Sequence, residues 1–324
     1  MKATSRETFA RFQSLIALAV MVVALSFLSE NFLTWTNGRN ILLQISVNLC
    51  LSIGMTLIIL TGGIDLSVGA ILAFGGAVAA GLLKNGVDLA GAGVHVQFTP
   101  FGACVAGVLA GVVLGWFNGF VITKFRLPPF VATLGMLSIA RGLTMLWTGG
   151  FPITALGDSF NFIGSGFWLR VPMPVWLCLG LVALFHVISR HTPLGRYIYA
   201  VGGNERAATY AGVRVNRIKV WVYTLGGGLA AFAGLINTAR LDAADPKAGL
   251  GYELDSIAAV VIGGTSLSGG RGSILGTVLG CLIIGVLNNG LALLDVSPFW
   301  QQVVKGAVIL TAVAVDKMGA KRAP

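Results

Sequence analysis

The residue types that most often carry out chemistry are few in this chain and form no catalytic pattern. Its three histidines, His95, His186 and His191, make no metal-binding cluster, and the last two do not share a helix face. The four cysteines are isolated within apolar segments and form no C-x-x-C pair. Neither a G-x-S-x-G nucleophile elbow nor an H-E-x-x-H zinc motif occurs. We therefore predict no catalytic residue and no metal site.

One carboxylate, Asp65, lies in a glycine-rich turn between two apolar segments, TGGIDLSVG (61–69). An acidic side chain within a membrane can bind an ion or a substrate. It can also cap the helix that follows, with Gly62 and Gly63 forming the turn. Its position at the start of an apolar segment favours the cap.

A second glycine-rich stretch, GGTSLSGGRG (263–272), contains LSGGR, the signature pattern of ATP-binding cassettes. No G-x-x-x-x-G-K-[ST] phosphate-binding loop accompanies it. We therefore do not expect this chain to bind ATP. The stretch shares the pattern GG-x-x-L-S-x-G with the turn at 61–69, which internal duplication and chance explain equally well.

The longest polar interruption is the basic loop 190–219. Basic residues beside membrane segments are retained in the cytoplasm, so this loop should face the cytoplasm. Gly202, Gly203 and Asn204 are expected to form a turn, with Asn204 capping a short helix that begins at Glu205. A short exposed helix suits docking into a groove on a soluble partner. The alternative is a solvated loop whose charge only sets the topology.

The elements that position these residues must lie in a membrane. The chain has 324 residues, of which 56% are hydrophobic and only 10% are charged, whereas an ordinary soluble domain is about 25% charged. We therefore predict an all-α, polytopic membrane protein that spans the lipid bilayer. The formal charge of +10 comes from basic residues in short loops and tails, and no nucleic-acid-binding surface is expected.

About ten apolar segments are predicted to form one transmembrane domain over residues 1–324. Most approach the roughly 20 residues that a bilayer crossing requires. Segment 256–264 is too short and is expected to be a half-helix or a re-entrant segment. Placing both termini inside puts most of the 22 Lys and Arg residues in the cytoplasm. The predicted spans are 12–28, 41–61, 66–83, 101–122, 130–147, 175–189, 220–239, 256–264, 274–294 and 299–315.

A ladder of glycines, Gly107, Gly111, Gly115 and Gly119, recurs every four residues along one predicted span. Such G-x-x-x-G steps lie on one helix face and let two helices approach closely. We predict a close helix–helix contact there, within one chain or across a dimer. Asn118, beside the ladder, is expected to form a hydrogen bond to another helix.

Several stretches together resemble the permease subunit of the ribose-type family of binding-protein-dependent ABC sugar importers. The resemblance covers most of the chain and is weaker around 86–97 and 149–174. The matching stretches are TLIILTGGIDLSVGA (56–70), PPFVATLGMLSIARGLTM (128–145), TPLGRYIYAVGGNERAATYAGV (192–213), GYELDSIAAVVIGGTSLSGGRGS (251–273) and LIIGVLNNGLALL (282–294).

This resemblance implies a transport subunit without enzymatic activity, which conducts a monosaccharide such as ribose across the bacterial inner membrane. The implied partners are a second copy of the permease, an ATPase with two fused nucleotide-binding domains and a periplasmic sugar-binding protein. ATP and Mg²⁺ would bind to the ATPase, and this chain would bind no cofactor. Both termini would be cytoplasmic.

The resemblance also implies that the loop 190–219 holds a coupling helix that docks on the ATPase. The match to the family's EAA-type pattern is partial, because Arg206 lies between the acid and the alanines. We assign the coupling to the four residues that match the pattern and to the three turn residues that precede them. We expect Ala207 and Ala208 to allow close approach to the ATPase and Gly212 to turn the chain away. The assigned residues are Gly202, Gly203, Asn204, Glu205, Ala207, Ala208 and Gly212.

Because a sugar is neutral and rich in hydroxyl groups, its route needs scattered amides and hydroxyls rather than charges. Five asparagines lie within or at the ends of spans, and hydrogen bonding between helices is the alternative for each of them. A different class of function, an ion-coupled secondary transporter of a small polar solute, would need a titratable group deep in the bundle. The candidate route residues are Asn48, Asn118, Asn237, Asn288 and Asn289.

Overall fold

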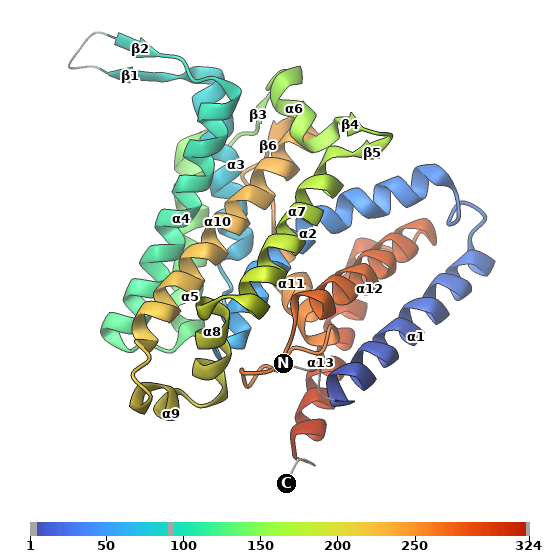
Figure 1. Ribbon diagram of the computed structural model, residues 1–324. Helices are drawn as coiled ribbons and strands as arrows, with labels where there is room; N and C mark the ends of the chain where they lie inside the picture. Colours follow the sequence, from blue (N-terminus) through green and yellow to red (C-terminus); the bar gives the residue numbers. More distant parts are fainter. Residues whose placement is uncertain (1–4, 90–93, 322–324) are drawn as a thin grey trace. The chain divides into compact units, whose positions relative to one another are not determined.

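The computed structural model describes residues 5–89 and 94–321. Within them the chain is mainly helical, with only short strands, which confirms the predicted all-α class (Figure 1). Each of the ten predicted spans coincides with a helix. These helices are α1 (Ser5–Leu28), α2 (Trp35–Leu60), α3 (Val68–Asn85), α4 (Pro100–Phe125), α5 (Pro129–Thr148), α7 (Met173–His191), α10 (Val215–Leu241), α11 (Tyr252–Ile262), α12 (Ile274–Leu293) and α13 (Pro298–Lys321).

Seven of the described helices are long and apolar enough to cross a membrane, so the predicted count of ten is approximate. The seven are α2, α3, α4, α5, α7, α10 and α12. The apolar part of α1 is shorter, Ser14–Leu28. Helix α11 has 11 residues. At 1.5 Å per residue it is about 17 Å long, which is too short for a bilayer core of about 30 Å.

Three described helices lie outside the predicted spans. They are α6 (Asp158–Ser165), α8 (Pro193–Gly203) and α9 (Glu205–Tyr210). Strands within the described residues form three short antiparallel pairs. They are β1 (Val87–Leu89) with β2 (Val94–Val96), β3 (Ile153–Thr154) with β6 (Ala243–Ala244), and β4 (Phe167–Trp168) with β5 (Val171–Pro172).

Hydroxyl side chains start several of the helices. Thr34, Thr99, Thr192 and Ser273 each accept a hydrogen bond from the backbone N–H three residues further on, at the starts of α2, α4, α8 and α12. In α4 and α8 a proline follows the cap, where its fixed φ suits the first helical turn and its missing N–H costs nothing. Local capping thus fixes where these helices begin.

The chain divides into two compact units. Unit 1 comprises Met1–Gly63, Cys178–Ile218 and Leu254–Pro324. Unit 2 comprises Ile64–Leu177 and Lys219–Glu253. The single transmembrane domain that we expect over residues 1–324 stays a prediction.

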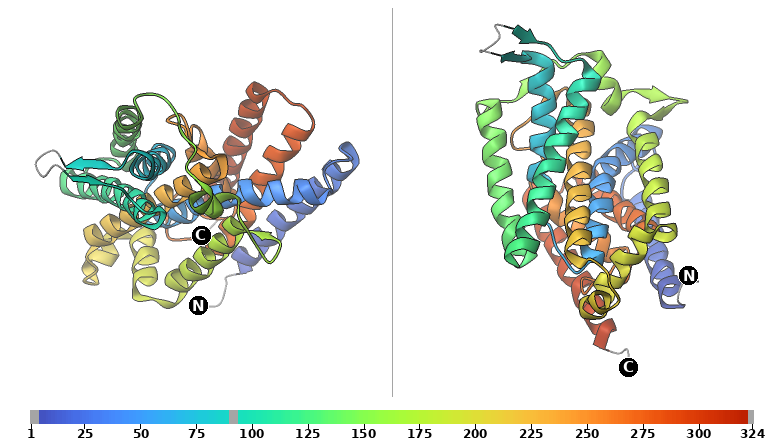
Figure 2. Two further views of the ribbon diagram at one scale, coloured as in Figure 1. Left: turned by 90° about the horizontal axis from the view of Figure 1, so that it is seen from above. Right: turned by 60° about the vertical axis from the view of Figure 1, so that its left-hand side comes forward.

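Unit 2 is built on α3, α4, α5 and most of α10, which lie side by side in the views of Figures 1 and 2. The β1–β2 hairpin extends beyond the ends of α3 and α4 in both figures.

The predicted glycine ladder lies on α4, where this helix packs against α3 and α10. A side chain at Gly107 would overlap α3 at Gly75, and side chains at Gly111 and Gly115 would overlap α10. Only glycine permits helix backbones to approach this closely.

Unit 1 packs α2 against α12 and α12 against α1. Polar side chains cross-link the apolar contact between α2 and α12. The Thr56 and Thr277 hydroxyls are 2.6 Å apart, and the Asn37 and Asn289 amides donate to each other at 3.0 and 2.8 Å. These buried groups satisfy each other, as side chains within a membrane must.

Candidate functional site

The predicted short helix is α9, and its start is as expected. The Asn204 carboxamide oxygen accepts a hydrogen bond from Ala207 N at 3.0 Å, and Glu205 lies in the first turn. Gly212, with a φ of +83°, follows the helix in the left-handed conformation that favours glycine. The expected turn at Gly202 and Gly203 is wrong, because both residues end helix α8.

The side chains of α9 differ in their availability to a partner. Glu205, Arg206 and Ala207 are exposed, and Tyr210 is 90% exposed. Ala208 is only 5% exposed, so it packs within the chain. This corrects the expectation that Ala208 presents a small side chain to a docking partner.

Helix α8 meets the two glycine-rich stretches that stood out in the sequence. Gly270 N donates to the Leu60 carbonyl at the end of α2 at 3.0 Å. A Cβ at Gly202 would overlap both the Leu60 carbonyl oxygen and Gly270 N. The Tyr199 hydroxyl of α8 donates to the Gly272 carbonyl at 2.8 Å. We call the meeting of Leu60–Gly62, Gly202–Gly203 and Gly269–Gly270 the glycine junction.

The glycine junction connects α8 and α9 to two membrane elements of unit 1. One is α2, which ends at Leu60, and the other is the loop between α11 and α12. In this arrangement the LSGGR pattern serves backbone packing. Gly269 and Gly270 have φ values of +82° and +71°, which a residue with a side chain rarely adopts.

Asp65, in unit 2, is fully buried before α3. Its Oδ1 accepts hydrogen bonds from Ser67 N at 2.8 Å and from the Ser67 hydroxyl at 2.6 Å. Ser67 is the N-cap residue of α3, so the prediction that Asp65 itself caps the helix is wrong. Asp65 instead accepts hydrogen bonds from this N-cap residue through Oδ1. Its other carboxylate oxygen, Oδ2, is buried and has no hydrogen-bond partner among the described residues.

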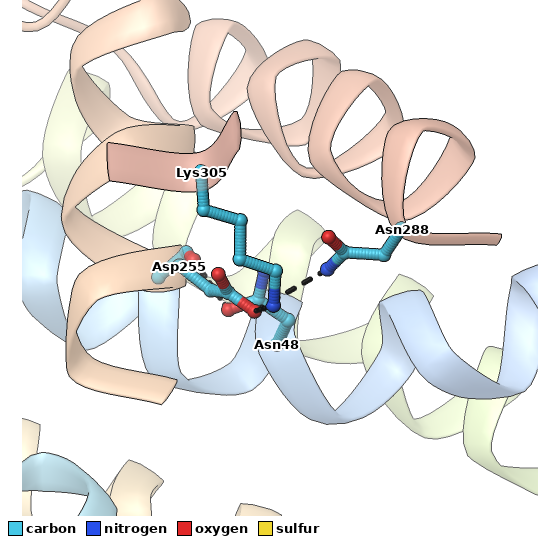
Figure 3. A network of polar contacts seen from close by, with 5 residues as sticks. Asn48, Asp255, Asn288 and Lys305 are labelled. Atoms are coloured by element: carbon cyan, nitrogen blue, oxygen red, sulfur yellow. Dashed lines mark hydrogen bonds and ion pairs between the residues drawn. The ribbon is translucent and has the colours of Figure 1, made fainter. Parts of the chain in front are cut away.

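The five candidate asparagines fall into different environments. Asn118 donates to the Ser67 hydroxyl at 3.0 Å, and Asn237 is buried on α10, both within unit 2. In unit 1, Asn289 is satisfied by its exchange with Asn37. Asn48 and Asn288 are the two that the structure places in one polar network (Figure 3).

That network is centred on two charged residues that the sequence predictions did not connect. The Lys305 ammonium of α13 lies 2.9 Å from Asp255 Oδ2 of α11. The Asn288 amide of α12 donates to the same oxygen at 3.3 Å. The Lys305 and Asp255 side chains are 28% and 11% exposed. We call Asp255, Lys305, Asn288 and Asn48 the membrane polar cluster, and Figure 3 shows their side chains close together. These residues belong to α11, α13, α12 and α2, respectively.

One sequence signal pointed to this cluster. Lys305 lies within an apolar predicted span, and a cation there requires a partner. Asp255 and Asn288 lie on other helices, so their position beside Lys305 follows only from the tertiary structure.

The sequence is similar to known membrane permeases along nearly its whole length. Residues 38–313 match the family described as "Branched-chain amino acid transport system / permease component". The ribose import permease of Bacillus subtilis is 50% identical over 305 residues, which are 93% of this chain and 91% of the relative.

The ribose import permease of Escherichia coli K12 is 50% identical over 309 residues, covering 94% and 92% of the two chains. The D-allose transport system permease of the same organism is 40% identical over 315 residues, covering 96% and 93%. Both the family match and these relatives cover far more than half of the chain. The chain therefore belongs to this family of transport-system permease components.

Proposed function

We propose that this chain is the permease subunit of an ABC importer that carries ribose across the bacterial inner membrane. The observation that carries the proposal is the 50% identity to two ribose import permeases over more than nine-tenths of each chain. Identity falls to 40% for a D-allose permease and 35% for a galactose/methyl galactoside permease, both of Escherichia coli. The family's description names amino acids, so the substrate rests on the relatives.

The partners follow from the same proposal. Importers of this kind use an ATPase and a solute-binding protein. Here we expect an ATPase with two fused nucleotide-binding domains, a periplasmic sugar-binding protein and a second copy of the permease. ATP and Mg²⁺ bind to the ATPase, and this chain binds no cofactor and hydrolyses nothing. Both termini lie in the cytoplasm, on the side of the basic loop 190–219.

In the proposed mechanism, α8 and α9 couple ATP hydrolysis to the membrane helices. The exposed side chains of α9, with Tyr210 the most exposed, supply the docking surface. The assigned residues Gly202–Glu205, Ala207 and Gly212 shape this segment. Movement of α9 passes through α8 to the glycine junction, where backbones in direct contact leave little room for one to move without the other. From there it reaches α2 and the loop between α11 and α12.

An ion-coupled secondary transporter is the second candidate. The observation in its favour is the Asp255–Lys305 pair, because titratable groups within a bundle can relay protons. Uptake by such a transporter would stop when an uncoupler collapses the proton gradient. The ABC proposal predicts the opposite, namely uptake that survives the uncoupler and stops when ATP is depleted.

The identity of the partners tests the proposal directly. Tagged permease is purified from its native membrane in mild detergent, and co-purifying proteins are identified by mass spectrometry. We expect an ATPase chain with two phosphate-binding loops, and a periplasmic protein that binds ribose in a calorimetric titration. A binding protein that prefers amino acids would overturn the ribose assignment, and the absence of any ATPase would overturn the ABC assignment.

A further inference from the structure

Asn48 and Lys305, two members of the membrane polar cluster, lie well inside their helices. Asn48 is 13 residues after Trp35, the first residue of α2, which is about 20 Å at 1.5 Å per residue. Lys305 is seven residues after Pro298, about 10 Å into α13. Charged groups at such depths are costly against lipid and are usually found facing a bundle interior or a water-filled space. The partial exposure of Lys305 therefore indicates an aqueous or ligand-filled side.

The cluster has hydrogen-bonding capacity that the described chain does not use. The Asn288 Oδ1 atom is buried and has no hydrogen-bond partner among the described residues. An ammonium group carries three N–H donors, and Lys305 directs one to Asp255. Burying an unsatisfied acceptor is costly, so a bound group that donates a hydrogen bond to Asn288 Oδ1 would recover part of this cost.

The neighbouring residue of α12 shows what a purely structural amide looks like. Asn289 both donates to and accepts from Asn37, so its hydrogen bonds are satisfied within the chain. Asn288 donates to Asp255 while its carbonyl oxygen remains unpaired. Two adjacent asparagines thus differ in the respect that matters for binding a ligand.

We propose that the membrane polar cluster is a binding site for a neutral polyol, such as a pentose, on its way through the membrane. The inference rests on the proposed function and assigns the residues that meet the sugar. Lys305 offsets the charge of Asp255, so the site carries no excess charge to attract an ion. A carboxylate and an amide oxygen accept from hydroxyl groups, while an ammonium and amide N–H groups donate to them. A sugar offers donors and acceptors on adjacent carbons, which this mixed set matches.

The first test replaces Asn288 with leucine, which has a similar size and no polar atoms. Asn288→Leu removes the 3.3 Å hydrogen bond that the Asn288 amide donates to Asp255 Oδ2. Because Lys305 still pairs with that oxygen and Asn288 Oδ1 has no partner to lose, the Asn288→Leu permease should reach the membrane in normal amount with only a small fall in melting temperature. Initial rates of radiolabelled ribose uptake are measured with the complete transporter and divided by the amount of permease. We expect a clear reduction in uptake per permease. An unchanged rate would overturn the proposal.

The second test measures contact directly and does not depend on transport by the variant. Asn288→Cys is introduced into a background whose four native cysteines have been replaced. The matched control is Val303→Cys on α13, which is 58% exposed and, two residues from Lys305, points to nearly the opposite side of that helix. Both are exposed to a charged, water-soluble thiol reagent in membranes that contain the complete transporter, with and without ribose.

We expect Asn288→Cys to react faster than Val303→Cys and ribose to slow only the Asn288→Cys reaction. A cysteine at 288 that does not react, or whose reaction ribose leaves unchanged, would overturn the site. If the wild-type transporter imports ribose in the same preparation, that failure concerns the site alone. If the wild type imports no ribose, the proposed function itself is wrong.

Discussion

At the scale of single residues, the Asp255–Lys305 pair brings two opposite charges together between helices α11 and α13. Within an apolar bundle, an ion pair costs less free energy than either of its charges would cost without the partner. Removal of one member leaves an uncompensated charge, whereas removal of both leaves two neutral groups. The pair should therefore respond to mutation in a strongly non-additive way.

We predict that Asp255→Asn and Lys305→Met each destabilise the purified permease more than the double variant does. In buried pairs, loss of one partner costs about 3–5 kcal/mol, and the 28% exposure of Lys305 should reduce this cost here. Thermal unfolding in detergent measures the effect. Single variants that melt with the wild type would show that the pair is not held in a low-dielectric environment.

His95, in the β1–β2 hairpin, offers a pH-dependent test outside the membrane helices. The imidazole Nδ1 lies 2.7 Å from Asp88 Oδ1, and hydrogen bonds to Asp88 and then Gln97 raise the pKa of His95 above its ordinary value. Protonated His95 therefore stabilises the hairpin at low pH, and this contribution is lost as pH rises through the raised pKa.

Histidine NMR titration of the wild type and of Asp88→Asn measures the two pKa values. We expect the wild-type pKa of His95 to lie above about 6.5, the ordinary value for histidine, and Asp88→Asn to lower it. A wild-type pKa at or below that value would show that the pairing does not form in solution.

At the scale of elements, the glycine junction explains how one short helix is connected to the membrane helices. Gly202 of α8 lies so close to the Leu60 carbonyl and Gly270 N that no side chain fits. We predict that Gly202→Ala lowers both thermal stability, by the ~1–3 kcal/mol typical of overpacking, and ATP-driven uptake.

The matched control is Gly180→Ala in α7, where an added Cβ meets no atom within 4 Å. This replacement should leave uptake unchanged and add slightly to helix stability. ATPase activity and uptake are measured together on the complete transporter. Gly202→Ala with full uptake would show that the junction transmits no movement.

The sequence predicted the elements well where hydrophobicity alone determines them. Long apolar runs rich in small residues correctly indicated the ten helices that coincide with predicted spans. The G-x-x-x-G ladder correctly indicated a close contact between helices. Helix α8 was missed because Gly202 and Gly203 indicate a turn when only local preference is considered. Position 202 requires glycine because the backbones of Leu60 and Gly270 leave no room for a side chain, and not because the chain turns there.

The candidate site was predicted less completely, for a physical reason. Asn204 was assigned correctly as a cap, because capping depends on residues three positions apart. The burial of Ala208 and the approach of Lys305 to Asp255 depend on other parts of the chain. Of the five asparagines, only the structure separates the paired Asn289 from Asn288, whose oxygen is unpaired.

At the scale of the whole molecule, the basic loop and the turn between β4 and β5 should face opposite sides of the membrane. Tyr210 and Leu169 are 90% and 70% exposed, so cysteines there should be accessible. In a cysteine-free background, an impermeant thiol reagent added to spheroplasts should label Leu169→Cys but label Tyr210→Cys only after permeabilisation. Equal labelling of both in intact spheroplasts would contradict the orientation with both termini inside.

The central claim is that this chain conducts ribose and that a partner's ATP hydrolysis drives the transport. The most direct measurement reconstitutes the permease with its ATPase in proteoliposomes, with binding protein and radiolabelled ribose outside and ATP inside. We predict ribose accumulation that requires both ATP and the binding protein and is unaffected by a protonophore. Accumulation that an ion gradient drives without ATP, or ATP-driven uptake of another solute with no uptake of ribose, would contradict the account.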